Sequence, residues 1–107
     1  MKLLIDVSNI TFMVSLAPSA KEFDKKQQVD AEGNPKWVTQ LIAMGNDEEE
    51  GAEVINVVTA GEKPNLSKST PVVPADLEAI PWVSKNREKN GVAYRASAIA
   101  PVKAAAK

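Results

Sequence analysis

The side chains that could carry chemistry in this chain are aromatic and basic. The 107 residues include five aromatic and thirteen basic ones, but neither Cys nor His. Their absence excludes thiolate nucleophiles and thiolate metal sites, and removes the usual general base and the commonest transition-metal ligand. No pair of acids has a sequence context typical of a glycosidase or a protease. We therefore expect a binding protein and not an enzyme, with no metal and no cofactor.

Aromatic residues with basic neighbours are typical of proteins that bind single-stranded nucleic acid, because bases stack on aromatic faces and phosphates follow a positive groove. Trp37 directly follows a lysine, Trp82 shortly precedes two basic residues, and Phe23 lies in a polar stretch among lysines. The candidate residues for binding nucleic acid are Phe23, Lys25, Lys26, Lys36, Trp37, Trp82, Lys85, Arg87, Lys89 and Arg95.

Each of these aromatic residues also has a structural alternative. Trp37 and Trp82 fall at the ends of expected strands and either cover the core or contact a ligand, since large rings are seldom wholly buried. Phe23 is either a loop anchor or a stacking platform. Tyr94 and Arg95 are neighbours in one expected strand and must point to opposite faces. With Tyr94 inside, Arg95 is either a nucleic-acid contact or a surface salt-bridge residue.

The charge of the chain is nearly balanced but unevenly distributed. The formal net charge of -1 argues against a protein held on DNA by bulk positive charge alone. Residues 45–62 contain six acids and no base, whereas residues 84–107 contain six bases and one acid. This asymmetry permits one face to meet an anion, although a solvated acidic loop is the simpler explanation of the acidic run.

The apolar residues that must position these side chains alternate with a period of two, which is typical of β-strands. They occupy odd positions over Leu3–Val7 and even positions over Ile10–Leu16. The change of phase at Ser8–Asn9 predicts a β-bulge that bends one long first strand. Phe12 belongs to the alternating set and is expected in the core.

Four further strands are predicted, at residues 37–44, 53–60, 71–82 and 91–100. Three prolines make the fourth strand an irregular one at an edge or with bulges. The polar stretch 17–36 is longer than an ordinary connection, so it is either a flexible functional loop or a protruding hairpin. A second loop, 84–90, links the last two strands.

Five strands, a bent first strand and long loops after strands one and four favour an oligonucleotide/oligosaccharide-binding (OB) barrel over an immunoglobulin sandwich, which needs about seven strands. We predict an all-β protein: a single five-stranded, OB-like Greek-key barrel over residues 1–101 with little or no helix, followed by a flexible tail at 102–107. The sequence contains no signal-peptide pattern and no apolar run of membrane-spanning length, so a cytoplasmic location is expected.

Short apolar strings in the second half of the chain carry a resemblance to a known family. Val72–Leu77, Ala79–Trp82 and Gly91–Ala96, followed by Ile99, resemble a pattern in small proteins of actinobacterial plasmids and integrative conjugative elements, which are labelled regulatory proteins. Residues 5–14, 33–37 and 53–58 are similar too, so the resemblance covers most of the chain. Ser69 departs from the pattern, where a glycine is expected. The resemblance implies a role in maintaining or controlling mobile DNA and brings no catalytic residue.

These observations predict a non-catalytic OB-fold protein that binds single-stranded DNA or RNA for a mobile element. The alternative is a protein-interaction module whose exposed strand edge or long loop docks a replication, transfer or transcription protein, and the low net charge favours it. Binding of duplex operator DNA is not favoured, because the sequence contains no helix-turn-helix and no paired basic ribbon. No membrane partner is expected, and the oligomeric state is left open.

Overall fold

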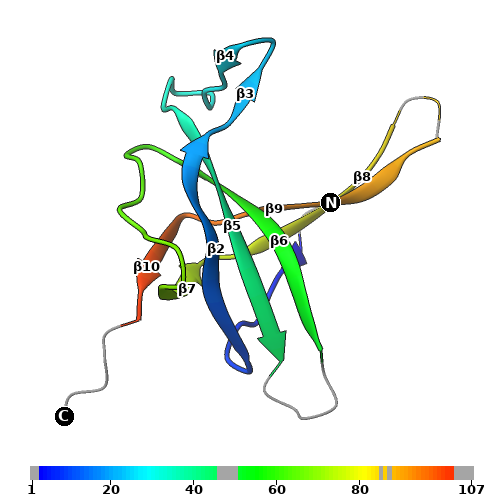
Figure 1. Ribbon diagram of the computed structural model, residues 1–107. Coiled ribbons are helices and arrows are strands. Elements are labelled where there is room, and N and C mark those ends of the chain that lie inside the picture. The colour runs from blue at the N-terminus through cyan, green and yellow to red at the C-terminus, as the bar shows by residue number, and fades with distance from the viewer. Residues whose placement is uncertain (1–2, 46–50, 85, 87, 103–107) are drawn as a thin grey trace.

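The computed structural model describes residues 3–45, 51–84, 86 and 88–102. Within them eight strands form one curled mixed sheet and two more form a separate hairpin (Figure 1). The sheet contains β1 (Leu3–Leu4), β2 (Ile10–Ala20), β5 (Lys36–Gly45), β6 (Ala52–Ala60), β7 (Pro71–Ala75), β8 (Glu78–Val83), β9 (Asn90–Arg95) and β10 (Ala98–Pro101), and the hairpin contains β3 (Glu22–Phe23) and β4 (Lys26–Gln27).

The described residues contain no helix, which confirms the all-β prediction. It follows that none of them belongs to a helix that could cross a membrane.

The order of the strands explains why the sheet curls. β2, β5 and β6 form an antiparallel meander, β9 pairs with β6 in parallel, and β8 pairs with β9. The full order is β1-β8-β9-β6-β5-β2-β7-β10. β7 and β8 therefore lie near opposite ends of the sheet, yet only Asp76 and Leu77 separate them in the chain. A two-residue link can join them only if the sheet curls until its two ends approach each other.

The number of strands in the sheet is eight, so the predicted number of five is wrong. The predicted fourth strand is interrupted at Asp76, whose φ of 52° lies in the left-handed region and ends the extended backbone. The predicted fifth strand is interrupted after Arg95, where the Ser97 N–H donates to the Ala75 carbonyl at 2.9 Å. The two halves of the predicted fourth strand pair with different neighbours. β7 pairs with β2 and β10, and β8 pairs with β1 and β9.

The phase change in the first segment is a turn, so the predicted β-bulge at Ser8–Asn9 is wrong. The Ser8 N–H donates to Asp6 Oδ1 at 2.9 Å, and the Ile10 N–H donates to the Val7 carbonyl at 3.1 Å. The turn separates β1, which pairs with β8, from β2, which pairs with β5 and β7. A turn and a bulge shift the side-chain alternation alike, so the pattern cannot distinguish them.

The polar stretch 17–36 forms a protruding hairpin, one of its two predicted forms (Figure 1). β2 continues to Ala20, which lies opposite Trp37 in β5. Asp24 and Lys25, between β3 and β4, have φ values of 55° and 65°. Two successive residues with positive φ are characteristic of the tight turn that matches the twist of a β-hairpin. At the base of the hairpin the Lys21 N–H donates to the Lys36 carbonyl at 3.0 Å.

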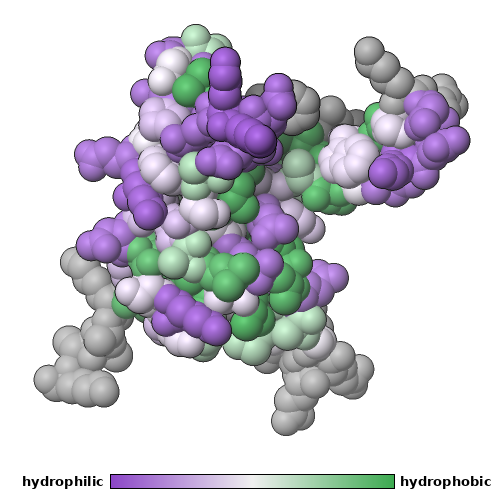
Figure 2. Space-filling view, turned by 45° about the horizontal axis from the view of Figure 1, so that its top comes forward, coloured by the Kyte–Doolittle hydropathy of each residue, from purple (hydrophilic) through white to green (hydrophobic). Residues whose placement is uncertain are grey.

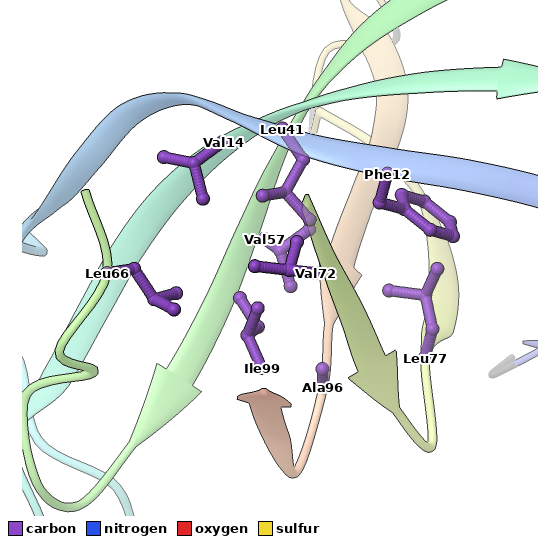
Figure 3. Close-up of a cluster of buried hydrophobic side chains, with 9 residues drawn as sticks. All are labelled: Phe12, Val14, Leu41, Val57, Leu66, Val72, Leu77, Ala96 and Ile99. Carbon is purple, nitrogen blue, oxygen red and sulfur yellow. The ribbon is translucent and has the colours of Figure 1, made fainter. Parts of the chain in front are cut away.

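The hydrophobic core fills the concave side of the sheet (Figure 3). Phe12 is 3% exposed, as the sequence predicts, and Leu66 contributes from the segment between β6 and β7. The remaining buried apolar residues are Val14, Leu41, Val57, Val72, Leu77, Ala96 and Ile99. Leu16 leaves the inward set and is exposed, because the pairing of β2 with β5 shifts register on both sides of it.

Ser69 lies in the turn that leads into β7 and has a φ of 71°. Its N–H donates to the Val14 carbonyl at 2.7 Å, and the next residue, Thr70, accepts from the Val14 N–H at 2.9 Å. The turn thus ties the segment to β2 with a backbone conformation that glycine adopts more easily than serine. This is the position at which the resemblance leads us to expect glycine.

The sequence predicts that the barrel ends at residue 101, but Val102 is still hydrogen-bonded to the sheet. Its N–H donates to the Pro71 carbonyl at 2.9 Å. The other residues of the predicted tail, 103–107, lie outside the described residues.

Candidate functional site

A groove runs between β6 and the hairpin formed by β8 and β9, which we call the arm. β6 and β9 pair at only two described positions, Val57 with Tyr94 and Val58 with Arg95, so the earlier residues of the two strands diverge. The space between them, the β6–β9 groove, has a volume of about 470 Å³. It is lined from the body of the sheet by Lys21, Val38, Val54, Ile55, Asn56 and Val58, and from the arm by Trp82, Val92, Ala93 and Tyr94.

The floor of the groove is the outer face of the sheet. On β6 the buried residues Val57 and Thr59 face the core, so Val54, Asn56 and Val58 face outwards. Figure 2 shows hydrophobic side chains on the body of the molecule, with hydrophilic ones gathered over the β3–β4 hairpin and the tip of the arm. The floor of the groove combines the apolar residues Val38, Val54, Ile55 and Val58 with Lys21 and Asn56.

Trp82 lines this groove from the arm. It lies opposite Gly91 in the register of β8 and β9. A Cβ added to Gly91 would lie 2.9 Å from Cζ2 and 3.1 Å from Cε2 of the indole, so the ring covers the glycine backbone. The side chain is nevertheless 45% exposed. An indole that packs against a glycine and stays partly exposed is suited to stacking on a planar group.

Trp37 has a different environment and does not line the β6–β9 groove. Its Nε1–H donates to the Gly61 carbonyl at 2.9 Å. The Lys63 Nζ lies 5.7 Å from the centroid of the ring, within reach of a cation–π interaction. Trp37 is half-buried and braces the turn after β6. Of the two tryptophans that the sequence treats alike, Trp82 is the one placed to contact a ligand in this groove.

None of the predicted basic residues that the structure describes lines the groove. Lys25 and Lys26 are exposed on the β3–β4 hairpin, and Lys89 is exposed at the base of the loop that closes the arm. Lys36 lies at the foot of the hairpin, where it lines a neighbouring hollow of about 480 Å³. Lys85, Arg87 and the side chain of Phe23 lie outside the described residues.

The charge of Arg95 is offset by an acid. Arg95 lies opposite Glu78 in the register of β8 and β9, and its Nη2 is 2.7 Å from Glu78 Oε1. The Arg95 Nε–H donates to the same oxygen at 3.1 Å. This geometry corresponds to the salt-bridge alternative of the sequence analysis. Arg95 also borders the hollow next to Lys36.

Asp30 holds a negative charge in the same hollow. Its Oδ1 accepts from the backbone N–H of Asn34 at 2.8 Å and of Glu32 at 2.9 Å, and its Oδ2 accepts from the Asn34 side chain at 3.1 Å. The bonds from Asn34, followed by that from Glu32 and by the charge of Lys36, hold the pKa of Asp30 below its ordinary value. Lys36 and the carboxylate of Asp30 thus border the same hollow.

Of the residues that line the groove, only Trp82 is among the predicted contacts, and the sequence analysis does not single out the polar residues Lys21 and Asn56. Lys21 immediately follows β2 and reaches the groove from the foot of the hairpin. The sequence signal for this surface is the apolar run Val54–Val58, interrupted by Asn56. A strand that is apolar on both faces places apolar residues on the outer face of the sheet, and an exposed apolar surface marks an interaction site.

Within the described residues no cluster of His, Cys, Asp and Glu could hold a metal ion. Comparison of the chain with protein-family models, with curated proteins and with solved structures finds no match. The β6–β9 groove combines a partly exposed indole with apolar residues, one lysine and one amide.

Proposed function

We propose that the protein is an OB-type, Greek-key barrel that binds single-stranded DNA or RNA in the β6–β9 groove without catalysing a reaction. The strand connections support the fold. The first three strands of an OB barrel correspond to β2, β5 and β6, the fourth corresponds to β7 together with β8, and the fifth corresponds to β9 together with β10. OB barrels bind oligonucleotides on the face of strands two and three, between the loops that follow strands one and four. In this protein that face is the floor of the groove.

The observation that carries the proposal is the partly exposed indole of Trp82, which packs against Gly91 and lines the groove. A base stacked on it gains about 1 to 3 kcal/mol of binding free energy. Lys21 lines the same groove and is available to a phosphate. Of the predicted basic contacts that the structure describes, Lys25 and Lys26 are exposed on the β3–β4 hairpin and Lys89 is exposed on the arm.

The low net charge limits the affinity that we expect. With a formal charge of -1 and with Lys36 and Arg95 near acids, few phosphate contacts are available. The dissociation constant is expected in the micromolar range at physiological salt, which is the regime of non-specific contacts. The resemblance to plasmid and conjugative-element proteins supports a role in the maintenance or control of mobile DNA.

Tryptophan fluorescence tests the proposal. Titration with a single-stranded oligonucleotide should quench the emission of the protein, and an equal length of duplex should quench it less. Replacing Trp82→Leu should remove the quenching and weaken binding by about 1 to 3 kcal/mol. Replacing Trp37→Phe, which leaves Trp82 in place, is the matched control and should retain the quenching. A folded protein that shows neither quenching nor a mobility shift at low salt would remove the nucleic-acid proposal.

A second candidate function is the docking of an extended peptide by strand addition. The Ala96 N–H donates to the Val58 carbonyl at 3.0 Å, so the backbone of Val58 is directed towards β9. By the alternation of a strand, the backbone groups of Asn56 and Val54 are directed the same way, into the diverging part of the groove. Such groups can pair with an added strand. This candidate becomes the leading one if oligonucleotides fail to quench Trp82.

A further inference from the structure

The arm exposes apolar side chains on the side of the sheet that forms the core elsewhere. Leu77, just before β8, and Ala96, just after β9, are buried on that side. The alternation of the strands and their register place Pro81, Val83 and Val92 on the same side, farther along the arm. Val83 is 63% exposed and Val92 is 47% exposed. The arm projects beyond the body of the sheet, so the side that is core in the body faces solvent in the arm (Figure 1).

The composition of the arm is that of a sheet covered on both sides. Ala79–Val83 is a run of five apolar residues, and Trp82 lies on the face opposite to Val83. Strands that are buried on both faces have such continuous apolar runs, whereas strands exposed on one face alternate apolar with polar residues. A hairpin of two strands is also only marginally stable without a covering element. The core-side face of the arm therefore has the character of an interaction surface.

A hollow of complementary character lies where β5 ends and β6 begins. It has a volume of about 510 Å³ and is lined by Ile10, Ala43, Gly45, Gly51, Ala52 and Glu53. Glu53 is exposed and is the charged residue among these described lining residues, and the sequence over residues 45–53 contains five acids and no base. The arm has the opposite charge, because residues 84–90 contain three bases and one acid, and Lys89 is exposed. Both the apolar surfaces and the charges of the arm and this hollow match.

We infer that the arm of one molecule docks into the β5–β6 hollow of a second copy. Pro81 and Val83 supply the apolar contact, and Lys89 meets Glu53 of the second copy. The arm points away from the hollow of its own chain, so the contact joins two molecules (Figure 1). A closed two-fold dimer, the commonest symmetric assembly, contains this contact twice. Trp82 lies on the other face of the arm, so the dimer contact and the β6–β9 groove use different faces.

Sedimentation equilibrium of protein freed of nucleic acid tests the inference. The average mass should rise with protein concentration above the 11.5 kDa of one chain. Val83→Gln removes an apolar side chain from each contact and should raise the dissociation constant of the dimer about ten-fold. Val73 in β7 is also exposed but lies outside the arm, so Val73→Gln is the matched control and should leave the dissociation constant unchanged.

An exchange of charges identifies the two surfaces that meet. Lys89→Glu and Glu53→Lys each place like charges in both contacts of the dimer and should each weaken association by roughly ten-fold. Mixing the two variants joins unlike charges again and should restore the dimer, a recovery that loss of structure would not produce. A folded protein that stays monomeric at every concentration would overturn the inference. Association that Val83→Gln does not weaken, or that mixing the charge variants does not restore, would overturn it as well.

Discussion

At the scale of single residues, backbone conformation explains a position where the sequence departs from its expected pattern. Ser69 has a φ of 71°, in a region where a side chain costs about 1 kcal/mol and glycine is favoured. Its side chain is exposed, and its backbone N–H makes the contact with Val14. Replacing Ser69→Gly should therefore raise the free energy of unfolding by about 0.5 to 1 kcal/mol, as measured by urea denaturation.

The reverse substitution at a comparable position is the control. Gly33 has a φ of 85°, and nothing lies within 4 Å of an added Cβ. Gly33→Ala therefore tests backbone strain without a steric clash, and it should lower the stability by about 1 kcal/mol. If Ser69→Gly lowered stability as well, the strain assigned to Ser69 would be wrong.

At the scale of elements, the arm formed by β8 and β9 depends on the absence of a side chain at Gly91. A Cβ there would lie 2.9 Å from the indole of Trp82, closer than side chains approach one another, so the ring must move. Gly91→Ala should displace Trp82 from its support and weaken oligonucleotide binding by up to the stacking contribution of about 1 to 3 kcal/mol. The core lies elsewhere, so the melting temperature should change little.

Fluorescence titration and thermal melting measure the two effects of Gly91→Ala separately. Gly51→Ala is the matched control, because nothing lies within 4 Å of a Cβ added at Gly51. It should alter neither binding nor melting. Oligonucleotide affinity unchanged by Gly91→Ala would show that the supported position of Trp82 has no part in binding.

At the scale of the whole molecule, the balance of charge sets the dependence of binding on salt. The chain contains thirteen basic and fourteen acidic residues, and two of the predicted contacts, Lys36 and Arg95, lie near acids. Because few phosphates are neutralised, the slope of log K against log salt should be shallow. Lys21→Ala should reduce its magnitude by about 0.7, the value for one phosphate of a single strand. Lys68 does not line the groove, so Lys68→Ala is the control and should leave the slope unchanged. A steep slope that Lys21→Ala does not alter would contradict the assignment of Lys21 as a phosphate contact.

The sequence by itself determined where the two central strands of the sheet lie. The richness of residues 37–44 and 53–60 in apolar and β-branched side chains is a local property, and β5 and β6 match those ranges to within one residue at each end. The burial of Phe12 follows from the alternation of apolar residues over Ile10–Leu16. The long stretch 17–36 was recognised as a loop or a hairpin because its composition is polar, and composition does not decide between the two.

Only the tertiary structure decided where strands end and which side chains meet. The break at Asp76 follows from pairing of β7 and β8 with different neighbours, and the pairing of Arg95 with Glu78 joins residues far apart in the chain. Trp37 and Trp82 look alike in sequence, but their contacts differ. The Trp37 Nε1–H donates to the Gly61 carbonyl, whereas the Trp82 ring packs against Gly91. The groove itself arises because β6 and β9 pair at one end and diverge at the other. Such contacts depend on non-local strand pairing, which a local alternation of residues does not encode.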